Sequence, residues 1–282
     1  MFHLQKTIRR ALAEDVGWGD ITSNSVVEKD QNVAAEITSR QQGILAGLEA
    51  ARQAFVLTDQ LIDLESDFIE GDSIAEGDVI AEVCGPGRGV LTAERVALNF
   101  LQRLSGIATA TSRAVKSVAD TDTEIIDTRK TTPGLRYLEK GAVRAGGGQN
   151  HRMGLDDAVL IKENHLFVAG GITEAVNRAR DRVGPTVKIE VETETLQQVQ
   201  EAVEAGADII MLDNMPVKKM REAVQLVTGS AMVEASGGMT PESIAEVAAC
   251  GVDLISMGYL THSAAPVDFS MNVIDVFKSQ GG

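Results

Sequence analysis

The sequence is poor in cysteine, which limits the kinds of stabilising site it can contain. Only two of its 282 residues are cysteines, Cys84 and Cys250, and they lie far apart in the chain. Their spacing fits neither a zinc motif nor a redox pair. We therefore expect both to be reduced residues of the hydrophobic core.

Long apolar runs are also missing. The nearest candidate for a membrane span, residues 247–266, is interrupted by Asp253, His262 and several glycines and serines. The first 17 residues carry Lys6, Arg9 and Arg10 as well as acidic side chains, so they lack the apolar core of a signal peptide. We expect no membrane segment and a cytoplasmic protein.

Positive charge is scarce over most of the chain. The formal net charge is −15, and no basic stripe is interleaved with aromatic residues, which make up only 4% of the sequence. Such a chain repels nucleic acid and anionic membranes, so we expect neither as a partner. The segment 127–165 is the exception, because its seven Lys and Arg residues exceed its five carboxylates by two. This local excess favours a small anionic ligand.

A hydrophobic content of 44% in 282 residues suffices for one large α/β barrel, or for a barrel with a smaller partner domain. Residues 1–115 indicate a mixed domain. Its patterns predict helices over 4–16, 48–57 and 92–118, a strand over 33–38, and a tight hairpin whose turns are Gly71-Asp72 and Gly77-Asp78.

From Thr123 onward, short β-rich apolar runs alternate with amphipathic helical stretches. Six such units predict a parallel α/β barrel over residues 116–265, although a doubly wound sheet gives the same linear pattern. The polar residues favour the barrel, because they fall where the strands end and barrel active sites lie at that edge. These strand ends are Asp127 to Lys130, Lys162, Glu190 and Glu192, Asp213-Asn214, Glu234 with Ser236 to Gly238, and Gly258.

Several cations follow these strands or the loops between them. Arg129 and Lys130 come directly after a buried strand, and Lys162 ends the next one. His151 and Arg152 follow three consecutive glycines, which favours a flexible loop that delivers two donors over a plain turn. A guanidinium and an ammonium together suit a ligand with more than one anionic group. The alternative for Arg129 and Lys130 is a basic surface loop.

The remaining strand ends are acidic or rich in glycine. Glu192 and Asp213 end consecutive strands and would hold Mg²⁺ beside a diphosphate; alternatively, they pair with Lys or Arg of the same rim. Ser236-Gly237-Gly238 precedes a predicted helix capped by Thr240, and a second loop contains Gly258. Paired loops of this kind are typical of phosphate sites in α/β barrels.

These motifs, in this order, resemble those of the quinolinate phosphoribosyltransferases, also called nicotinate-nucleotide pyrophosphorylases (carboxylating). The matching segments include LTAERVALNFLQRLSGIAT, DTRKTTPGLRYLEKGAVRAGGGQNHRMGL, LIKENH, IEVET, MLDNM, EASGG and ISMGYLTHSAAPVDFSM. The resemblance implies an open, irregular α/β barrel with an N-terminal α/β sandwich domain, onto which residues 266–282 would pack. It also implies transfer of a phosphoribosyl group from phosphoribosyl pyrophosphate to quinolinate with loss of carbon dioxide, and a homodimer or larger oligomer with shared active sites.

The resemblance also assigns roles by position. Arg95 would reach the substrate carboxylates across a dimer, and Glu192 and Asp213 would serve the ribose hydroxyls and Mg²⁺, with Lys130 as a third catalytic residue. The other implied substrate-binding residues are Arg129, Lys130, His151, Arg152 and Lys162 for the dianion, and Ser236, Gly237 and Gly258 for the ribose phosphate. Asp156, Glu163 and the pair Gly87 and Gly89 depart from the family pattern, which bears on substrate preference.

Three other functions fit parts of the same pattern. A family paralogue of the molybdenum-transport-associated type would act on another anionic heterocycle. A Schiff-base aldolase would use Lys162 at its strand end. A non-catalytic protein would simply bind an anion. The complete set of cations favours quinolinate.

Overall fold

The computed structural model describes residues 2–278 and divides into two compact units, here called the first and the second unit. Met1 and residues 279–282, the outer ends of the expected domain spans, lie outside the described residues. The first unit comprises Met1–Ala110, Thr132–Gly147 and Ala264–Gly282, and the second comprises Thr111–Thr131 and Gly148–Ser263.

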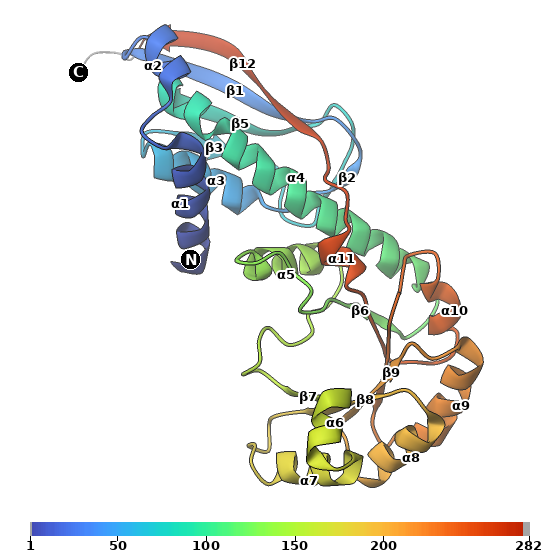
Figure 1. Ribbon diagram of the computed structural model, residues 1–282. Helices are drawn as coiled ribbons and strands as arrows, with labels where there is room; N and C mark the ends of the chain where they lie inside the picture. The colour runs from blue at the N-terminus through green and yellow to red at the C-terminus, as the bar shows by residue number, and fades with distance from the viewer. Residues whose placement is uncertain (1, 279–282) are drawn as a thin grey trace. The chain divides into compact units, whose positions relative to one another are not determined.

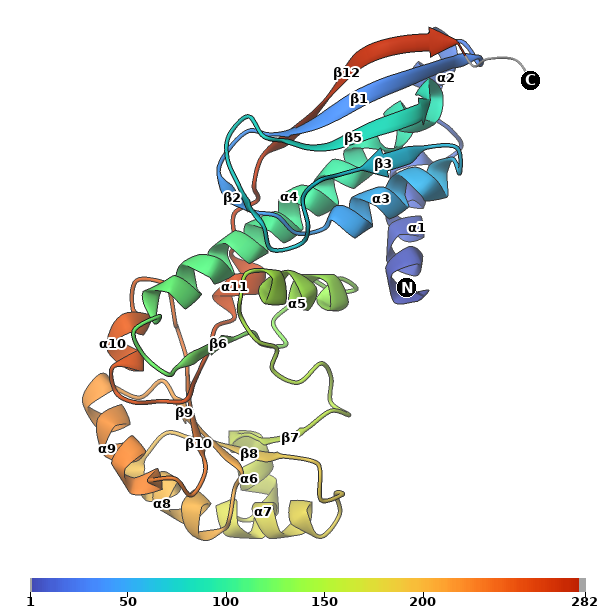
Figure 2. The same ribbon diagram turned by 180° about the vertical axis from the view of Figure 1, so that it is seen from behind.

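The first unit is built on a four-stranded antiparallel sheet in the order β12-β1-β5-β3, with helices α3 and α4 against one face (Figures 1 and 2). Its strands are β1 (Gln31–Ser39), β2 (Gly43–Ile44), β3 (Asp63–Glu65), β4 (Ser73–Ile74), β5 (Val79–Pro86) and β12 (Phe269–Lys278). Its helices are α1 (Phe2–Val16), α2 (Ile21–Val26), α3 (Leu48–Thr58), α5 (Arg136–Ala145) and most of α4 (Gly87–Ser117).

Alternation along the strands decides which side chains enter this core. In β1 every second residue from Val33 to Ser39 is buried, as expected for a strand with one covered face. In β5 the same alternation buries Val83 and leaves Cys84 exposed. The expectation that both cysteines are core residues is therefore wrong for Cys84, whereas Cys250 is buried.

The two Gly-Asp pairs form turns but do not form the expected hairpin. Gly71 and Gly77 have φ of +98° and +93°, a region that favours glycine. The Asp72 and Asp78 carboxylates accept backbone N–H groups three residues upstream, each at 2.8 Å. However, β4 pairs with β2, while β5 pairs with β1 and β3. The first turn therefore precedes β4 of the two-stranded sheet, and the second precedes β5 of the four-stranded sheet.

The unit boundaries differ from the expected spans of 1–115 and 116–265. Residues 132–147, which contain α5, group with the first unit. One reason is a buried ion pair, in which the Glu139 carboxylate lies 2.8 Å from the Arg103 guanidinium of α4. At the C-terminal end, β12 pairs with β1 from Ser39↔Phe269 to Gln31↔Lys278.

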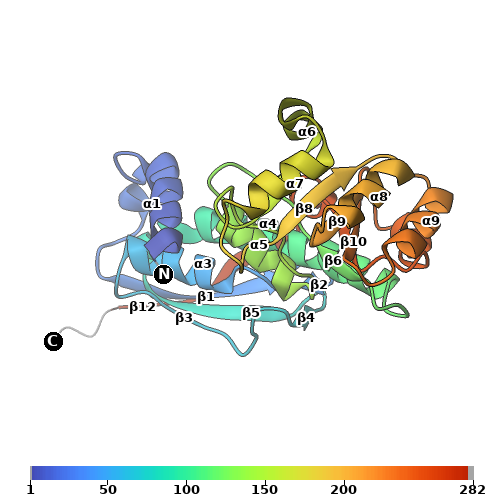
Figure 3. The same cartoon turned by 90° about the horizontal axis from the view of Figure 1, so that it is seen from below.

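The second unit is a parallel sheet in the order β6-β11-β10-β9-β8-β7. The strands follow one another as in a barrel, and the last, β11, pairs with the first, β6. Among the described residues β6 and β7 form the two edges, so the barrel is open between them. Helices α7, α8 and α9 cover the outside (Figure 3). A doubly wound sheet would instead reverse its strand order at an internal switch point.

The strands of the second unit are β6 (Glu124–Ile126), β7 (Val159–Ile161), β8 (Ile189–Thr193), β9 (Ile209–Asp213), β10 (Met232–Ser236) and β11 (Leu254–Ser256). Its helices are α6 (Glu163–Ala169), α7 (Ile172–Arg180), α8 (Leu196–Glu204), α9 (Val217–Val227), α10 (Ile244–Ala248) and α11 (Tyr259–His262). Within residues 2–278, no helix has both the length and the apolar character needed to cross a membrane.

Two helical glycines provide a matched test of packing in the first unit. A Cβ atom added at Gly106 would lie 2.3 Å from the Ala265 carbonyl oxygen, whereas one added at Gly141 meets nothing within 4 Å. Gly106→Ala should therefore destabilise the protein by about 1–3 kcal/mol. Gly141→Ala should stabilise it by roughly 0.5–1 kcal/mol, because alanine loses less backbone entropy in a helix. Thermal unfolding of both variants checks the opposite signs, and a stable Gly106→Ala protein would refute the packing argument.

Candidate active site

The carboxyl ends of the parallel strands surround a cavity of about 570 Å³ in the second unit. Nine of the predicted site residues line it: Arg129, Lys130, His151, Arg152, Lys162, Glu192, Asp213, Ser236 and Gly237. A larger cavity of about 750 Å³ in the first unit has a mainly apolar lining and lacks this concentration of charge. Polar strand ends meeting at one edge are the geometry of barrel active sites.

Two predicted residues, Gly258 and Arg95, do not line this cavity. Gly258 packs against the Lys130 side chain, because a Cβ at that position would lie 2.9 Å from Lys130 Cδ. Arg95 is an exposed residue of α4 in the first unit. Of the departures from the family pattern, Asp156 and Glu163 are also absent from the lining.

The backbone after β6 is fixed by short-range hydrogen bonds. The Lys130 N–H donates to Thr128 Oγ1 at 3.0 Å, and the Lys130 carbonyl accepts from Thr261 Oγ1 of α11 at 2.8 Å. These contacts hold the strand end that carries Arg129 and Lys130. Both side chains are exposed and reach the cavity.

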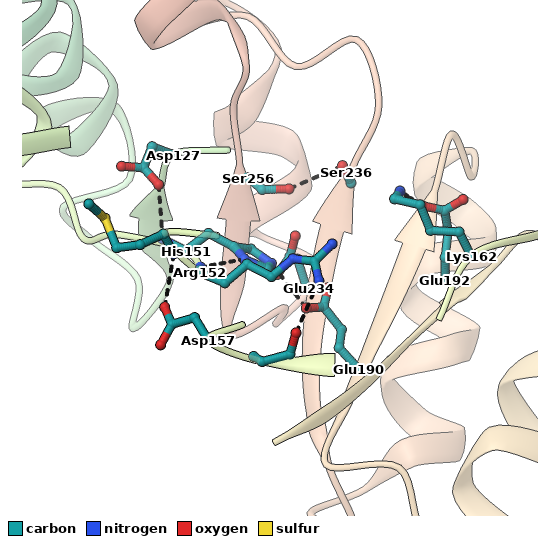
Figure 4. A network of polar contacts seen from close by, with 12 residues as sticks. Asp127, His151, Arg152, Asp157, Lys162, Glu190, Glu192, Glu234, Ser236 and Ser256 are labelled. Carbon is teal, nitrogen blue, oxygen red and sulfur yellow. Dashed lines mark hydrogen bonds and ion pairs between the residues drawn. The ribbon is translucent and has the colours of Figure 1, made fainter. Parts of the chain in front are cut away.

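Residues 149–152 form the loop that carries His151 and Arg152, here called the 149–152 loop. Asp127, which is fully buried at the end of β6, accepts the Asn150 side-chain amide at 2.6 Å and the His151 backbone N–H at 2.9 Å. The Arg152 guanidinium donates to the Ala158 carbonyl at 3.0 Å. Figure 4 shows His151 and Arg152 lying between Asp127 and the strands β8 and β10. The loop is thus tied to several strands.

The His151 ring meets two glutamates that were not among the predicted site residues: Glu234, which also lines the cavity, and Glu190, which does not. Its Nε2 lies 3.0 Å from a Glu190 carboxylate oxygen and 3.5 Å from one of Glu234. Glu190 is 2% exposed and Glu234 is fully buried. The sequence carried a signal for both, since each interrupts an otherwise apolar strand, but neither was assigned a role. We call these three residues the His151 cluster.

The protonation of the ring follows from its two nitrogens. Burial lowers the pKa of His151, but the contacts to Glu190 and Glu234 outweigh burial and raise it to about 10. The Arg152 backbone N–H nevertheless donates to Nδ1 at 2.7 Å, which requires that Nδ1 carry no proton. Both observations place a proton on Nε2. A pKa of about 10 favours an imidazolium at neutral pH, whereas the amide contact at Nδ1 requires a neutral Nε2–H ring. We assign the neutral ring from the 2.7 Å geometry of that contact, which is part of the loop backbone.

The carboxylates at the rim already have partners. Glu192 forms an ion pair with Lys162, and Asp213 accepts the side-chain amide of Asn214 at 2.8 Å. Of the arrangements open from the sequence, Glu192 thus adopts the pairing with a lysine of the same rim (Figure 4).

The loop after β10 has a backbone that requires glycine. Gly237 has φ of +102°, and a Cβ there would lie 2.3 Å from Asn214 Oδ1. Ser236 accepts the Ser256 hydroxyl at 3.1 Å, which joins the ends of β10 and β11. The expected cap at Thr240 is wrong, because α10 begins at Ile244 and residues 241–243 form a turn. Any phosphate bound here would meet the loop backbone before the start of a helix.

Two groups of side chains have the chemistry of metal ligands. The His151 cluster brings one ligand atom from each residue within 4.8 Å of the others. However, a proton on Nε2 and a hydrogen bond into Nδ1 leave no lone pair on the ring for a metal. Glu192 and Asp213 offer oxygen atoms at the open cavity, and two carboxylates together with substrate phosphates are a usual set for Mg²⁺. The residues present therefore fit Mg²⁺ at the rim.

A chain that combines an antiparallel sandwich with an open parallel α/β barrel, and that has cations, carboxylates and a glycine-rich loop at the barrel mouth, defines a phosphoribosyltransferase of the type II fold. The description "Quinolinate phosphoribosyl transferase, C-terminal domain" matches residues 107–272, and the corresponding N-terminal domain matches residues 20–105. The chain therefore belongs to the quinolinate phosphoribosyltransferase family. This confirms the resemblance and the fold class inferred from the sequence.

Similar proteins support the assignment over nearly the whole chain. The "Probable nicotinate-nucleotide pyrophosphorylase [carboxylating]" of Bacillus subtilis is 48% identical over 97% of this chain and 95% of its own length. The chloroplastic nicotinate-nucleotide pyrophosphorylase of Arabidopsis thaliana is 40% identical over 96% of this chain and 83% of its own. The crystal structure of NadC from Streptococcus pyogenes superposes with a TM-score of 0.94 at 39% identity, covering 99% of this chain and 98% of that one.

Proposed function

We propose that this chain transfers a phosphoribosyl group from phosphoribosyl pyrophosphate to quinolinate and releases pyrophosphate and carbon dioxide, giving nicotinate mononucleotide for NAD biosynthesis. Family membership over both domains supports the activity. The observation that carries the site assignment is the single cavity in which four Lys and Arg side chains face a glycine-rich loop and the carboxylates of Glu192, Asp213 and Glu234.

The charges of the cavity suggest how the two substrates would divide it. Quinolinate carries two carboxylates, and Arg129, Lys130, Arg152 and Lys162 offer donors of the matching sign. His151 would act with this group. The loop at Ser236 and Gly237, with Gly258 behind Lys130, would receive the ribose phosphate through backbone N–H groups. The anomeric carbon would then lie between the pyridine nitrogen and the rim carboxylates.

The chemistry requires stabilisation of positive charge on the ribose as pyrophosphate leaves. Glu192 and Asp213 supply negative charge at that position and would bind the ribose hydroxyls, while Lys130 lies close enough in the cavity to attract the leaving group. After the ring nitrogen bonds to the ribose, the adjacent carboxylate can leave as carbon dioxide because the cationic ring stabilises the carbanion. No covalent bond to the protein is needed, so the main task is alignment.

We further propose that Glu192 and Asp213 hold Mg²⁺ together with the diphosphate. When bound, the cation would neutralise charge that develops on the leaving pyrophosphate. Lys162 would exchange its Glu192 partner for a quinolinate carboxylate under these conditions. An aldolase that forms an imine at Lys162 is less compatible with the structure, because the Lys162 side chain is engaged in an ion pair with Glu192.

The assembly and the location of the protein extend the same proposal. We propose a homodimer or larger oligomer in which Arg95 of one chain completes the cavity of another. The cytoplasmic location expected from the sequence stays a prediction, and the chloroplastic relative illustrates that family members also occur in organelles.

The direct test is to incubate the protein with quinolinate, phosphoribosyl pyrophosphate and Mg²⁺ and to measure nicotinate mononucleotide and carbon dioxide in equal amounts. Omitting Mg²⁺ and adding a chelator should stop the reaction. A protein that binds quinolinate but never forms the nucleotide would contradict the proposal and favour a non-catalytic anion-binding protein.

Nicotinate, which lacks the carboxylate next to the nitrogen, should be a poor substrate. When only one carboxylate is present, the four Lys and Arg side chains of the cavity lose the interactions that a second substrate carboxylate would make with them. We expect kcat/KM for nicotinate to be lower than for quinolinate by roughly 100-fold or more. Comparable values for both acids would point to a paralogue with another anionic heterocycle as substrate.

A further inference from the structure

The His151 cluster contains two carboxylates where a barrel interior normally holds apolar side chains. Glu190 and Glu234 lie two residues before Glu192 and Ser236 on β8 and β10, one layer below the residues that line the rim. The His151 Nε2 contacts at 3.0 and 3.5 Å are ion-pair distances without hydrogen-bond geometry, and no donor among the described residues forms a hydrogen bond with Glu190 Oε1 or either Glu234 oxygen. Burying a carboxylate with so few partners is expensive, so the pair needs a compensating role.

The pair acts on the cavity through one side chain. His151 turns Nε2 toward the glutamates and accepts the Arg152 amide at Nδ1, so both ring nitrogens serve to hold the 149–152 loop. The loop has no helix or strand of its own, and Asp127 anchors it from β6 on the other side. The imidazole therefore links β8 and β10 to the backbone of Arg152.

Charge provides a second connection to the same arginine. Burial lowers the pKa of Arg152, the nearby Arg129 cation lowers it further, and the Glu190 carboxylate raises it. The pKa of the Glu190 carboxyl is itself raised by burial, against the opposing contacts to His151 and Arg152.

We propose that Glu190 and Glu234 are positioning residues of the cavity that would bind quinolinate: by facing His151 Nε2 they fix the 149–152 loop, which carries Arg152. The proposed role of both glutamates is exerted through His151, although Glu234 also lines the cavity. This inference rests on the proposed function only in taking quinolinate as the ligand. It differs from a metal site, because a proton occupies the position that a metal would take on the ring.

The test uses the isosteric variants Glu234→Gln and Glu190→Gln, with Glu194→Gln as a control that removes an exposed carboxylate just beyond β8. Calorimetry should show that quinolinate binds roughly tenfold more weakly to either cluster variant. Steady-state kinetics should show a raised KM for quinolinate, with the KM for phosphoribosyl pyrophosphate and the thermal unfolding temperature close to wild type. Glu194→Gln should match wild type in every measurement.

Nuclear magnetic resonance of the ligand-free protein tests the cluster without relying on quinolinate. The sequence has four histidines, and the His151 signal is assigned by its loss in His151→Gln. In the wild type its ring should be the Nε2–H form with a slowly exchanging Nε2 proton, and in both cluster variants that proton should exchange faster. If these exchange rates are observed but the wild type does not bind quinolinate, the proposed function is refuted and the role of the cluster in holding the loop is retained.

Three results would overturn the inference. One is unchanged quinolinate affinity in both cluster variants. Another is a His151 ring whose proton lies on Nδ1 in the wild type. The third is stoichiometric binding of Zn²⁺ or Mn²⁺ by the wild type that is lost in both variants, which would make the cluster a metal site. If a single variant unfolds, the other variant and the wild-type ring assignment still decide the question.

Discussion

Lys162→Ala should lose nearly all quinolinate turnover while the protein stays folded. Lys162 is exposed at the end of β7 and lines the cavity, so its removal leaves no core void. It does remove a cation that we expect to pair with a substrate carboxylate, and it leaves Glu192 without its ion-pair partner. If the bound substrate removes this pair from water, loss of one partner costs about 2–5 kcal/mol, so kcat/KM should fall by roughly 30-fold to several thousand-fold.

The matched control is Lys219→Ala, which removes an exposed lysine from α9, outside the cavity. It should retain wild-type kinetics. Arg129→Ala should behave like Lys162→Ala, since it removes another cation of the same cavity. Thermal unfolding and circular dichroism establish whether each variant is folded. Near-normal activity of Lys162→Ala, or its unfolding, would count against the assignment.

The second large effect concerns the proposed sharing of active sites. Arg95→Ala and Lys162→Ala proteins should each be inactive alone, because every proposed shared site requires both side chains. Arg95 belongs to the first unit and Lys162 to the second. After mixing and subunit exchange, a heterodimer would contain one site with both lesions and one site with neither. About half of a random dimer population is heterodimeric, so activity should recover to roughly a quarter of wild type.

Native mass spectrometry of isotope-labelled chains measures the exchange independently of activity. Arg113→Ala, which removes an exposed arginine further along α4, is the control and should be active alone. If heterodimers form and no activity returns, Arg95 serves its own chain or only the fold, and the shared site is wrong.

The sequence located most of the candidate site because strand ends are local features. Apolar runs that stop at Arg129, Lys162, Glu192 and Asp213 mark the carboxyl edge of a parallel sheet, and one edge of a barrel collects them. The structure places all four around one cavity. The alternating pattern of β1 likewise predicted a strand over residues 33–38, two residues inside its start and one inside its end.

The errors arise where partners are distant in the chain. Cys84 was expected in the core because cysteine is usually buried, but the alternation set by Val83 turns it outward. The Gly-Asp turns were read correctly, yet only the sheet shows that β4 pairs with β2. The cap at Thr240 failed because three residues of turn precede α10.

By itself the sequence determined the periodicities, the order of the βα units and the family, since these depend on neighbours along the chain. Only the tertiary structure decided that Glu190 and Glu234 converge on His151, that Glu192 pairs with Lys162, and that α5 groups with the first unit. The physical reason is the same in each instance. A buried charge selects its partner by proximity in the folded state, and residues from different strands become neighbours only when the sheet sets their register.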